Sequence, residues 1–152
     1  MRSELTIDLD AVRHNARRLI AALEGAELWA VVKADAYGHG AEVCGRAALE
    51  AGAEALCVAS AGEGAALRTA FPEPRILVMS PADDDDVAQA REAKLELMVS
   101  GPPPPGVTVH VKLDSGMGRW GLSELVRPER NVVGLATHLA TADTDLDFAR
   151  AA

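Results

Sequence analysis

Hydrophobic residues follow two alternating spacings along this chain, one typical of helices and one typical of buried strands. Apolar residues recur at helical spacing from Leu9 to Leu23. Asp8 and Asp10 stand at capping positions, and Gly25 follows as a stop signal. The whole pattern predicts helices over residues 9–23, 41–51, 63–69 and 83–94, and strands over residues 28–32, 55–59, 76–79, 95–99, 107–113 and 131–137.

Strands that alternate with helices indicate a parallel sheet with helices outside it. A closed eight-stranded α/β barrel typically takes about 250 residues. This chain has 152 residues and six predicted strands. By counting alone, a doubly wound open sheet is therefore favoured over a barrel.

Two short segments carry unusual composition. Four consecutive aspartates occupy residues 83–86, where they favour the positive end of a helix dipole. The same run could hold a metal ion, but no glycine or glutamate stands at the spacing of a calcium loop, so a helix start is the better interpretation. Residues 102–105 are all proline and predict a stiff linker. The four histidines show no zinc-binding spacing, and no metal site is predicted.

Composition narrows the class of protein further. With 15 basic and 23 acidic residues, the net charge of −8 argues against nucleic acid as a partner. The hydrophobic content of 49% supports a single folded domain. Cys44 and Cys57 lack CxxC spacing and are interpreted as buried thiols in a reducing compartment. With no secretory signal and no apolar run of about 18 residues, we expect a cytoplasmic protein that does not contact a membrane.

Lysine is rare, and its positions suggest chemistry. The chain contains only Lys33, Lys94 and Lys112. Lys33 ends a predicted strand, and the carboxyl ends of strands are where α/β folds bind ligands. A lysine partly removed from water there is a competent amine nucleophile for a carbonyl cofactor or substrate. A lysine that merely extends into solvent from a strand end fits Lys33 equally well.

The strand over residues 107–113 has one polar face. Strand alternation places Thr108, His110 and Lys112 on one side and the valines on the other. A parallel strand in a doubly wound sheet is normally apolar on both faces. The polar face therefore favours a strand that lines the polar mouth of a barrel.

Two further segments follow strand ends. The glycine-rich loop over residues 115–121 carries Arg119, which is suited to an anionic group. After the last predicted strand, alternation places His138 on the same side as Gly134 and Ala136, leaving room for a flat ligand against the imidazole. Three polar strand ends together indicate a binding site at this end of the sheet.

These residues resemble a known family. The segment over residues 30–40, AVVKADAYGHG, resembles the pyridoxal-phosphate signature of bacterial alanine racemases, and residues 7–15, 109–119 and 137–143 agree with the family in the same order. The resemblance runs from near residue 3 to the C-terminus. It implies that residues 1–152 form the N-terminal cofactor-binding domain of a fold-type III pyridoxal-phosphate enzyme. The fold class it implies is α/β, an incomplete (β/α)8 TIM-type barrel with about six βα units, in place of the open sheet.

The resemblance also implies a role for each candidate residue. In that family, the lysine that matches Lys33 forms a Schiff base with pyridoxal 5'-phosphate and acts as one of two proton-transfer bases. The tyrosine matching Tyr37 contacts the cofactor phosphate, and the histidine matching His138 packs against the pyridine ring. The arginine matching Arg119 hydrogen-bonds near the cofactor phenolic oxygen and the substrate carboxylate. The lysine matching Lys112 is often carbamylated and then orients that arginine.

The activity implied is interconversion of L-alanine and D-alanine, which supplies D-alanine for peptidoglycan. Racemisation needs a base on each face of the planar intermediate, and Lys33 serves one face. The implied partners are a small amino-acid substrate and, for the full-length family, a second subunit in a homodimer. That subunit contributes a tyrosine as the second base from a C-terminal β-domain, which we expect to be absent from a truncated chain.

The chain departs from the family pattern at three places. Ser115 stands where the family usually has threonine, and the segments around residues 102–105 and 124–130 are short for the helices usual there. Three interpretations stay open: the N-terminal part of an alanine racemase, a non-catalytic pyridoxal-phosphate binding barrel that keeps Lys33, and a fragment that binds nothing.

Overall fold

The computed structural model describes residues 3–124, 131–141 and 143–151. Strands and helices alternate through most of this range, as the hydrophobic spacing predicted. The elements are α1 (Leu9–Ala22), β1 (Trp29–Val31), α2 (Lys33–Gly38), α3 (Ala41–Glu50), β2 (Ala55–Val58), α4 (Ala61–Ala70), β3 (Arg75–Val78), α5 (Asp84–Glu92), β4 (Glu96–Val99), β5 (Thr108–Lys112), β6 (Val132–Ala136) and α6 (Leu146–Ala151).

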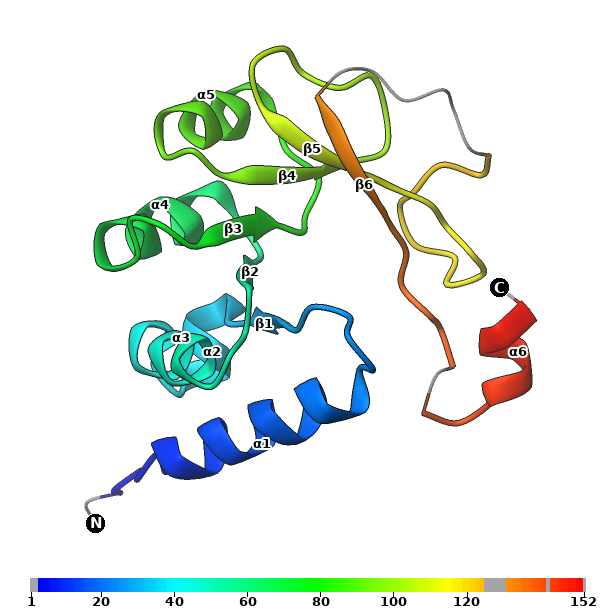
Figure 1. Cartoon of the computed structure of the whole chain (residues 1–152). Helices are drawn as coiled ribbons and strands as arrows, with labels where there is room; N and C mark the ends of the chain where they lie inside the picture. The colour runs from blue at the N-terminus through cyan, green and yellow to red at the C-terminus, as the bar shows by residue number, and fades with distance from the viewer. Residues whose placement is uncertain (1–2, 125–130, 142, 152) are drawn as a thin grey trace.

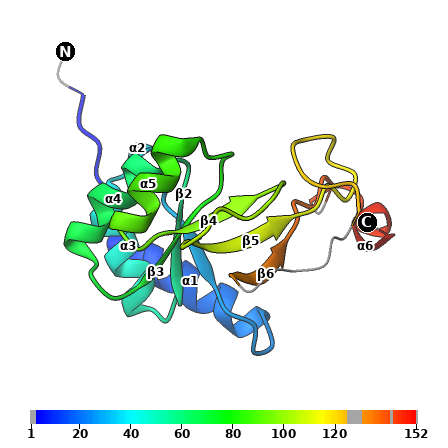
Figure 2. The ribbon, with the colours of Figure 1, turned by 90° about the horizontal axis from the view of Figure 1, so that it is seen from above.

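All six strands pair in parallel, and their order in the sheet is their order in the chain, β1 through β6. Helices α3, α4 and α5 lie along the outer face, and the inner face is concave (Figures 1 and 2). A doubly wound sheet reverses its strand order at a switch point, whereas a barrel sheet adds each new strand on the same side. The barrel-type α/β architecture with six strands is therefore confirmed, and the open sheet favoured by counting is wrong.

The connections between the later strands are short. No helix separates β4 from β5, where the four prolines lie in a bend, a turn and irregular chain, as the short segment predicted. The second short segment, residues 124–130, lies outside the described residues except for Glu124. Two short helices, α2 and α6, were not predicted. The last, α6, lies beside the loop after β5, where the Phe148 ring comes close to Gly116.

The hydrophobic core lies between the outer face of the sheet and the helices. Leu56, Ile76 and Leu97 on the central strands have no exposed surface. They belong to one buried cluster that includes Leu67 and Phe71 from α4 and the residue after it. Burying a side chain of this size contributes about 2 kcal/mol to the stability of the fold. This layer therefore fixes which face of each strand packs against the helices.

The predicted helix starts are confirmed in detail. The Asp8 carboxylate accepts hydrogen bonds from the backbone N–H groups of Asp10 and Ala11, at 2.9 and 3.0 Å, and so caps α1. Asp83 and Asp86 form a reciprocal capping box at the start of α5. The acidic run therefore begins a helix, as its sequence indicated.

The inner face carries polar side chains. On β5, Val109 and Val111 face the outer core, while the alternate residues His110 and Lys112 are 7% and 4% exposed. The His110 ring meets the Trp29 ring edge to face, with centroids 5.3 Å apart. Because Trp29 lies on β1 and His110 on β5, this contact crosses the concave side and shows how strongly the sheet curves.

Candidate active site

Lys33 is the second residue after β1 and the first of α2, at the carboxyl end of the sheet. Its side chain is half-buried, and its Nζ lies 5.8 Å from the centre of the Tyr37 ring, which is 62% exposed. The structure thus brings together two of the predicted site residues. An amine beside an exposed aromatic ring, at the carboxyl end of the sheet, can meet a ligand from solvent.

The chain turns after Lys33 in an unusual way. Ala34, Asp35, Ala36 and Tyr37 all have left-handed backbone angles, with φ between 50 and 57°. The left-handed region costs a non-glycine residue roughly 1–2 kcal/mol. Four such residues in a row persist only where the surroundings hold them, so this turn is fixed by contacts outside its own backbone preferences.

Several hydrogen bonds hold this turn. The Ala36 N–H donates to the Val32 carbonyl oxygen at 2.9 Å, and the Ala41 N–H donates to Asp35 Oδ1 at 2.6 Å. From elsewhere in the chain, Glu63 Oε1 accepts from the Ala34 N–H at 2.9 Å. Glu63 was not singled out from the sequence.

Lys112 ends β5 with its side chain almost fully buried. Its Nζ donates to the carbonyl oxygens of Trp120 and Leu113, at 2.6 and 3.3 Å, and lies 5.2 Å from the centre of the Trp120 ring. Within the described residues, no carboxylate pairs with this ammonium. Lys112 is therefore held by carbonyl dipoles and an aromatic face.

The loop after β5 is shaped by Asp114. Its Oδ1 accepts hydrogen bonds from the N–H groups of Gly116 and Gly118, at 3.2 and 3.1 Å. These two amides are thereby occupied and are not free to hold an anion. Arg119 in the same loop is exposed, and a guanidinium is chemically suited to an anionic group.

His138 follows β6 and is exposed. Since β1 and β6 form the two edges of the sheet, Lys33 and His138 lie at opposite sides of the same carboxyl end. The strand pattern suggested that Gly134 leaves room for a flat ligand against His138. In the structure, the space beside Gly134 is taken by another side chain. A Cβ at Gly134 would lie 2.6 Å from Nδ1 of His110, so the missing side chain makes room for the His110 imidazole on β5.

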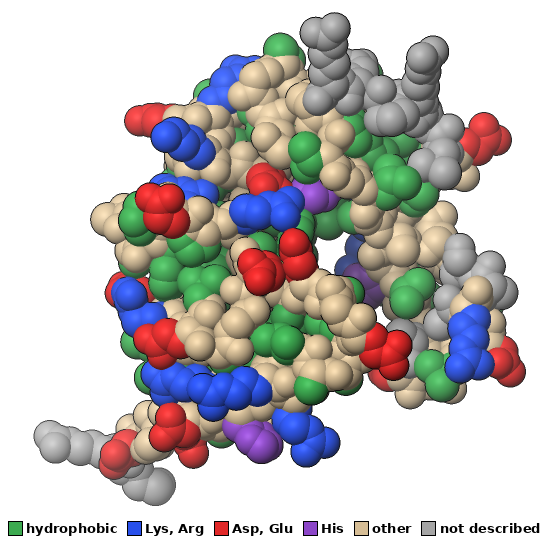
Figure 3. Space-filling view, viewed as in Figure 1, with side chains coloured by type: hydrophobic (Ala, Val, Ile, Leu, Met, Phe, Trp, Pro, Cys, Tyr) green, Lys and Arg blue, Asp and Glu red, His purple; other side chains and the backbone are tan. Residues whose placement is uncertain are grey.

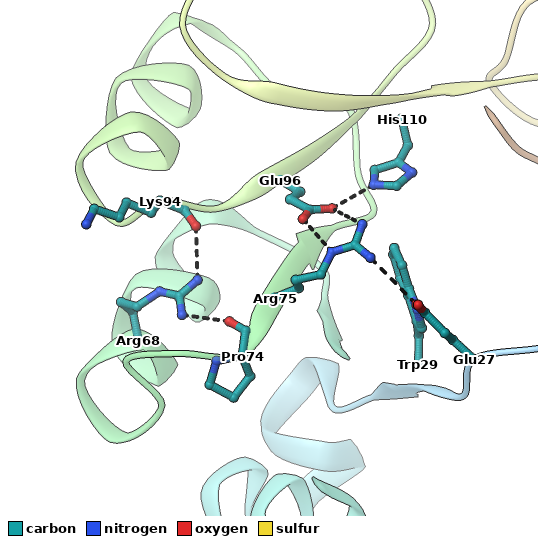
Figure 4. A network of polar contacts seen from close by, with 8 residues as sticks. All are labelled: Glu27, Trp29, Arg68, Pro74, Arg75, Lys94, Glu96 and His110. Atoms are coloured by element: carbon teal, nitrogen blue, oxygen red, sulfur yellow. Dashed lines mark hydrogen bonds and ion pairs between the residues drawn. The ribbon is translucent and has the colours of Figure 1, made fainter. Parts of the chain in front are cut away.

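A polar network lies on the inner face near the amino ends of β1, β3 and β4 (Figure 4). Glu96 accepts from Arg75 Nε at 2.7 Å and from His110 Nε2 at 2.7 Å. Arg75 also stacks on Trp29, 4.4 Å from the ring centre, and lies 3.6 Å from the Glu27 carboxylate. The network borders a hollow of about 430 Å³ on the concave side, and in the space-filling view that face is visibly hollowed (Figure 3).

The network perturbs the ionisation of its members. Burial alone would raise the pKa of Glu96, but hydrogen bonds and charge from His110 and Arg75 outweigh it and lower that pKa to about 2.

The cysteines lie outside this network. Burial, with a smaller effect from the Glu96 charge, raises the pKa of the Cys57 thiol to about 11. Both cysteines are buried and unpaired, in agreement with the sequence interpretation.

The described residues contain neither a helix with the length and hydrophobicity needed to cross a membrane nor a group of three or more metal-ligating side chains.

Comparison with known proteins decides the family. The model of the alanine racemase N-terminal domain matches residues 7–152. The chain belongs to this family. It is 41% identical to the alanine racemase of Beutenbergia cavernae over 90% of its length, and 38% identical to that of Geobacillus stearothermophilus over 90%.

Solved structures of the family share the fold. The crystal structure of alanine racemase from E. faecalis superposes with a TM-score of 0.81 at 31% identity, over 93% of this chain and 45% of that one. The alanine racemase from Streptomyces coelicolor superposes with a TM-score of 0.77 at 36% identity, over 91% of this chain and 44% of that one. The chain spans less than half the length of the curated relatives it matches: 43% of the Beutenbergia cavernae enzyme and 41% of the Geobacillus stearothermophilus enzyme.

Proposed function

We propose that this chain is the cofactor-binding barrel portion of a pyridoxal 5'-phosphate dependent alanine racemase. The observation that carries the proposal is Lys33, half-buried after β1 with its Nζ 5.8 Å from the Tyr37 ring centre. The reaction is interconversion of L-alanine and D-alanine, which supplies D-alanine for peptidoglycan. The proposed setting is a homodimer in the cytoplasm.

The residues at the carboxyl end of the sheet fit this cofactor. Pyridoxal phosphate presents an aldehyde, a phenolic oxygen, a pyridine ring and a phosphate. Lys33 offers an amine for the aldehyde, and the exposed Tyr37 offers a hydroxyl for the phosphate. Arg119 offers a guanidinium for the phenolic oxygen, and His138 offers a flat ring for the pyridine. When bound, the cofactor supplies the electron-withdrawing ring that disperses the charge left as the α-proton of an amino acid departs.

Each side chain then has a defined task. Lys33 Nζ holds the cofactor and moves a proton at one face of the substrate Cα. Arg119 orients the substrate carboxylate. Lys112, the last residue of β5, reaches this loop, and its Nζ donates to the Trp120 carbonyl oxygen. Carbamylation of Lys112 would replace this cation by an anion, and that anion would orient Arg119.

Covalent trapping tests the cofactor site. The chain is incubated with pyridoxal phosphate, reduced with borohydride, digested and mapped by mass spectrometry. Since the chain has three lysines, the label can be assigned to Lys33, Lys94 or Lys112. We expect the label at Lys33, its loss in Lys33→Ala, and its retention in Lys94→Ala, because Lys94 is an exposed lysine after α5.

Proton transfer is tested by exchange of the α-hydrogen of alanine with deuterium oxide, followed by NMR. Exchange requires one base only, so it reports on Lys33 without a second base. The control is Lys33→Ala with the same amount of cofactor. Label and exchange together support the racemase. Label without exchange favours a non-catalytic pyridoxal-phosphate binding barrel, and no label at Lys33 contradicts both.

A further inference from the structure

The carboxylate of Glu63 joins two strand ends. Its Oε1 accepts from the N–H of Ala34, directly after Lys33, at 2.9 Å, and its Oε2 accepts from the N–H of Ala59, directly after β2, at 2.7 Å. Both bonds are charge-assisted and end on rigid backbone. Glu63 therefore ties the start of the left-handed turn to the neighbouring strand.

The backbone of Glu63 is itself well anchored. Glu63 lies in the first turn of α4, and its N–H donates to Oγ of the capping residue Ser60 at 3.2 Å. Ser60 and Glu63 have the spacing of a capping box, in which the glutamate normally reaches back to the N–H of the capping residue. Here both carboxylate oxygens bond to amides other than that of Ser60, and one of those amides is 29 residues away.

The turn needs such an outside contact. Ala34 is the first of four consecutive non-glycine residues with left-handed angles. Among the residues that the structure describes, Glu63 is the one side chain from outside residues 33–41 that hydrogen-bonds the backbone of residues 33–37. The direction of the Lys33 side chain and the place of the Tyr37 ring both depend on this backbone.

We infer that Glu63 is a positioning residue, whose carboxylate fixes the left-handed turn and so aims Lys33 Nζ and the Tyr37 ring at one ligand. The inference rests on the proposed function of Lys33 as the residue that holds the cofactor. Glu63 itself touches neither Lys33 Nζ nor the Tyr37 ring in the described contacts. It acts through the amide of Ala34.

Glu63→Gln tests the inference with little change of shape. A glutamine amide has one acceptor oxygen, and its NH₂ group would face a backbone N–H, donor against donor. The matched control is Glu42→Gln, which removes a carboxylate from the first turn of α3, where Glu42 is exposed and pairs with Arg46.

Two measurements are made on the full 152-residue chain. The first is amide hydrogen exchange of Ala34 and Ala59 without cofactor, which we expect to be about tenfold faster in Glu63→Gln. The second is a titration with pyridoxal phosphate, read as borohydride-trapped label at Lys33. We expect half-saturation at a concentration at least about tenfold higher than for the wild type. Glu42→Gln should match the wild type in both.

The outcomes separate this inference from the proposed function. Uptake at Lys33 by the wild type, with half-saturation in Glu63→Gln within about twofold, overturns the positioning role alone. An equal loss in Glu63→Gln and Glu42→Gln also overturns it, because the effect would then be one of charge. No uptake by the wild type overturns the proposed function and this role together.

A general loss of stability is distinguishable from misplacement of Lys33. Circular dichroism and urea unfolding report whether Glu63→Gln is folded under the conditions of the titration. If it is not, Glu63→Asp takes its place, since it keeps the charge but shortens the reach by about 1.5 Å. A folded variant with normal exchange at Ala34 and normal uptake at Lys33 contradicts the inference.

Discussion

Replacing Glu96 by glutamine tests the polar network on the inner face of the sheet. The side chain of Glu96 is 13% exposed and accepts hydrogen bonds from both Arg75 and His110. These partners lower its pKa from 4.5 to about 2, despite the opposing effect of burial. A difference of this size between the unfolded and folded chain corresponds to about 3 kcal/mol of stability at neutral pH.

The sign of the pH dependence follows from the lowered pKa. The contribution of Glu96 is fully present above the ordinary pKa of 4.5 and is lost as the pH falls towards about 2. Near pH 3.5, the unfolded chain already binds a proton at this position while the folded chain does not. About 1 kcal/mol of the contribution should then be lost.

Urea unfolding measures the effect at about pH 7 and about pH 3.5. We expect Glu96→Gln to be less stable than the wild type by about 2–3 kcal/mol at neutral pH, with the difference about 1 kcal/mol smaller at the acidic pH. The control is Glu92→Gln, which removes an exposed carboxylate from α5. Equal stability of Glu96→Gln and the wild type at neutral pH, or a difference that does not change with pH, would refute the reasoning.

Three further predictions concern single positions. Gly134→Ala should lower the free energy of unfolding by about 2 kcal/mol, since its Cβ would lie 2.6 Å from the His110 ring; unchanged urea unfolding would contradict this. Asp83→Ala should cost about 1 kcal/mol in the same assay because the capping box with Asp86 is lost, and an effect near zero would show that the box is not stabilising. Cys57, with its pKa raised to about 11 by burial, should react with iodoacetamide at about pH 8 only after unfolding; fast alkylation of the folded chain would contradict its burial.

Local patterns predicted the helices and strands well. The Asp8 cap, the acidic start of α5 and the alternation along β5 each depend on a few neighbouring residues, and each is found in the structure. The strand count alone led to the wrong sheet, because it carries no information on strand order. The polar face of β5 was the better guide to the barrel-type curvature.

The candidate site was only partly readable from the sequence. Position at a strand end and rarity of lysine pointed to Lys33, and the structure places Tyr37 beside it. The left-handed turn could not be predicted, since alanine and tyrosine disfavour a positive φ and aspartate adopts one only as a single residue, not in a run of four. The contact of Glu63 with Ala34 was equally hidden, because the spacing from Ser60 indicates only a local helix cap.

The left-handed turn sets limits on how this protein could be stabilised. Glycine at Ala34 or Ala36 would relieve the backbone strain, by about 1 kcal/mol at each position. Glycine also gives the unfolded chain more freedom, which offsets part of that gain. It would further let the peptide after Lys33 rotate, so a gain in thermal stability there would make the Lys33 amine more mobile. A stabilised variant that keeps its lysine fixed should therefore be sought in the helices of the outer layer.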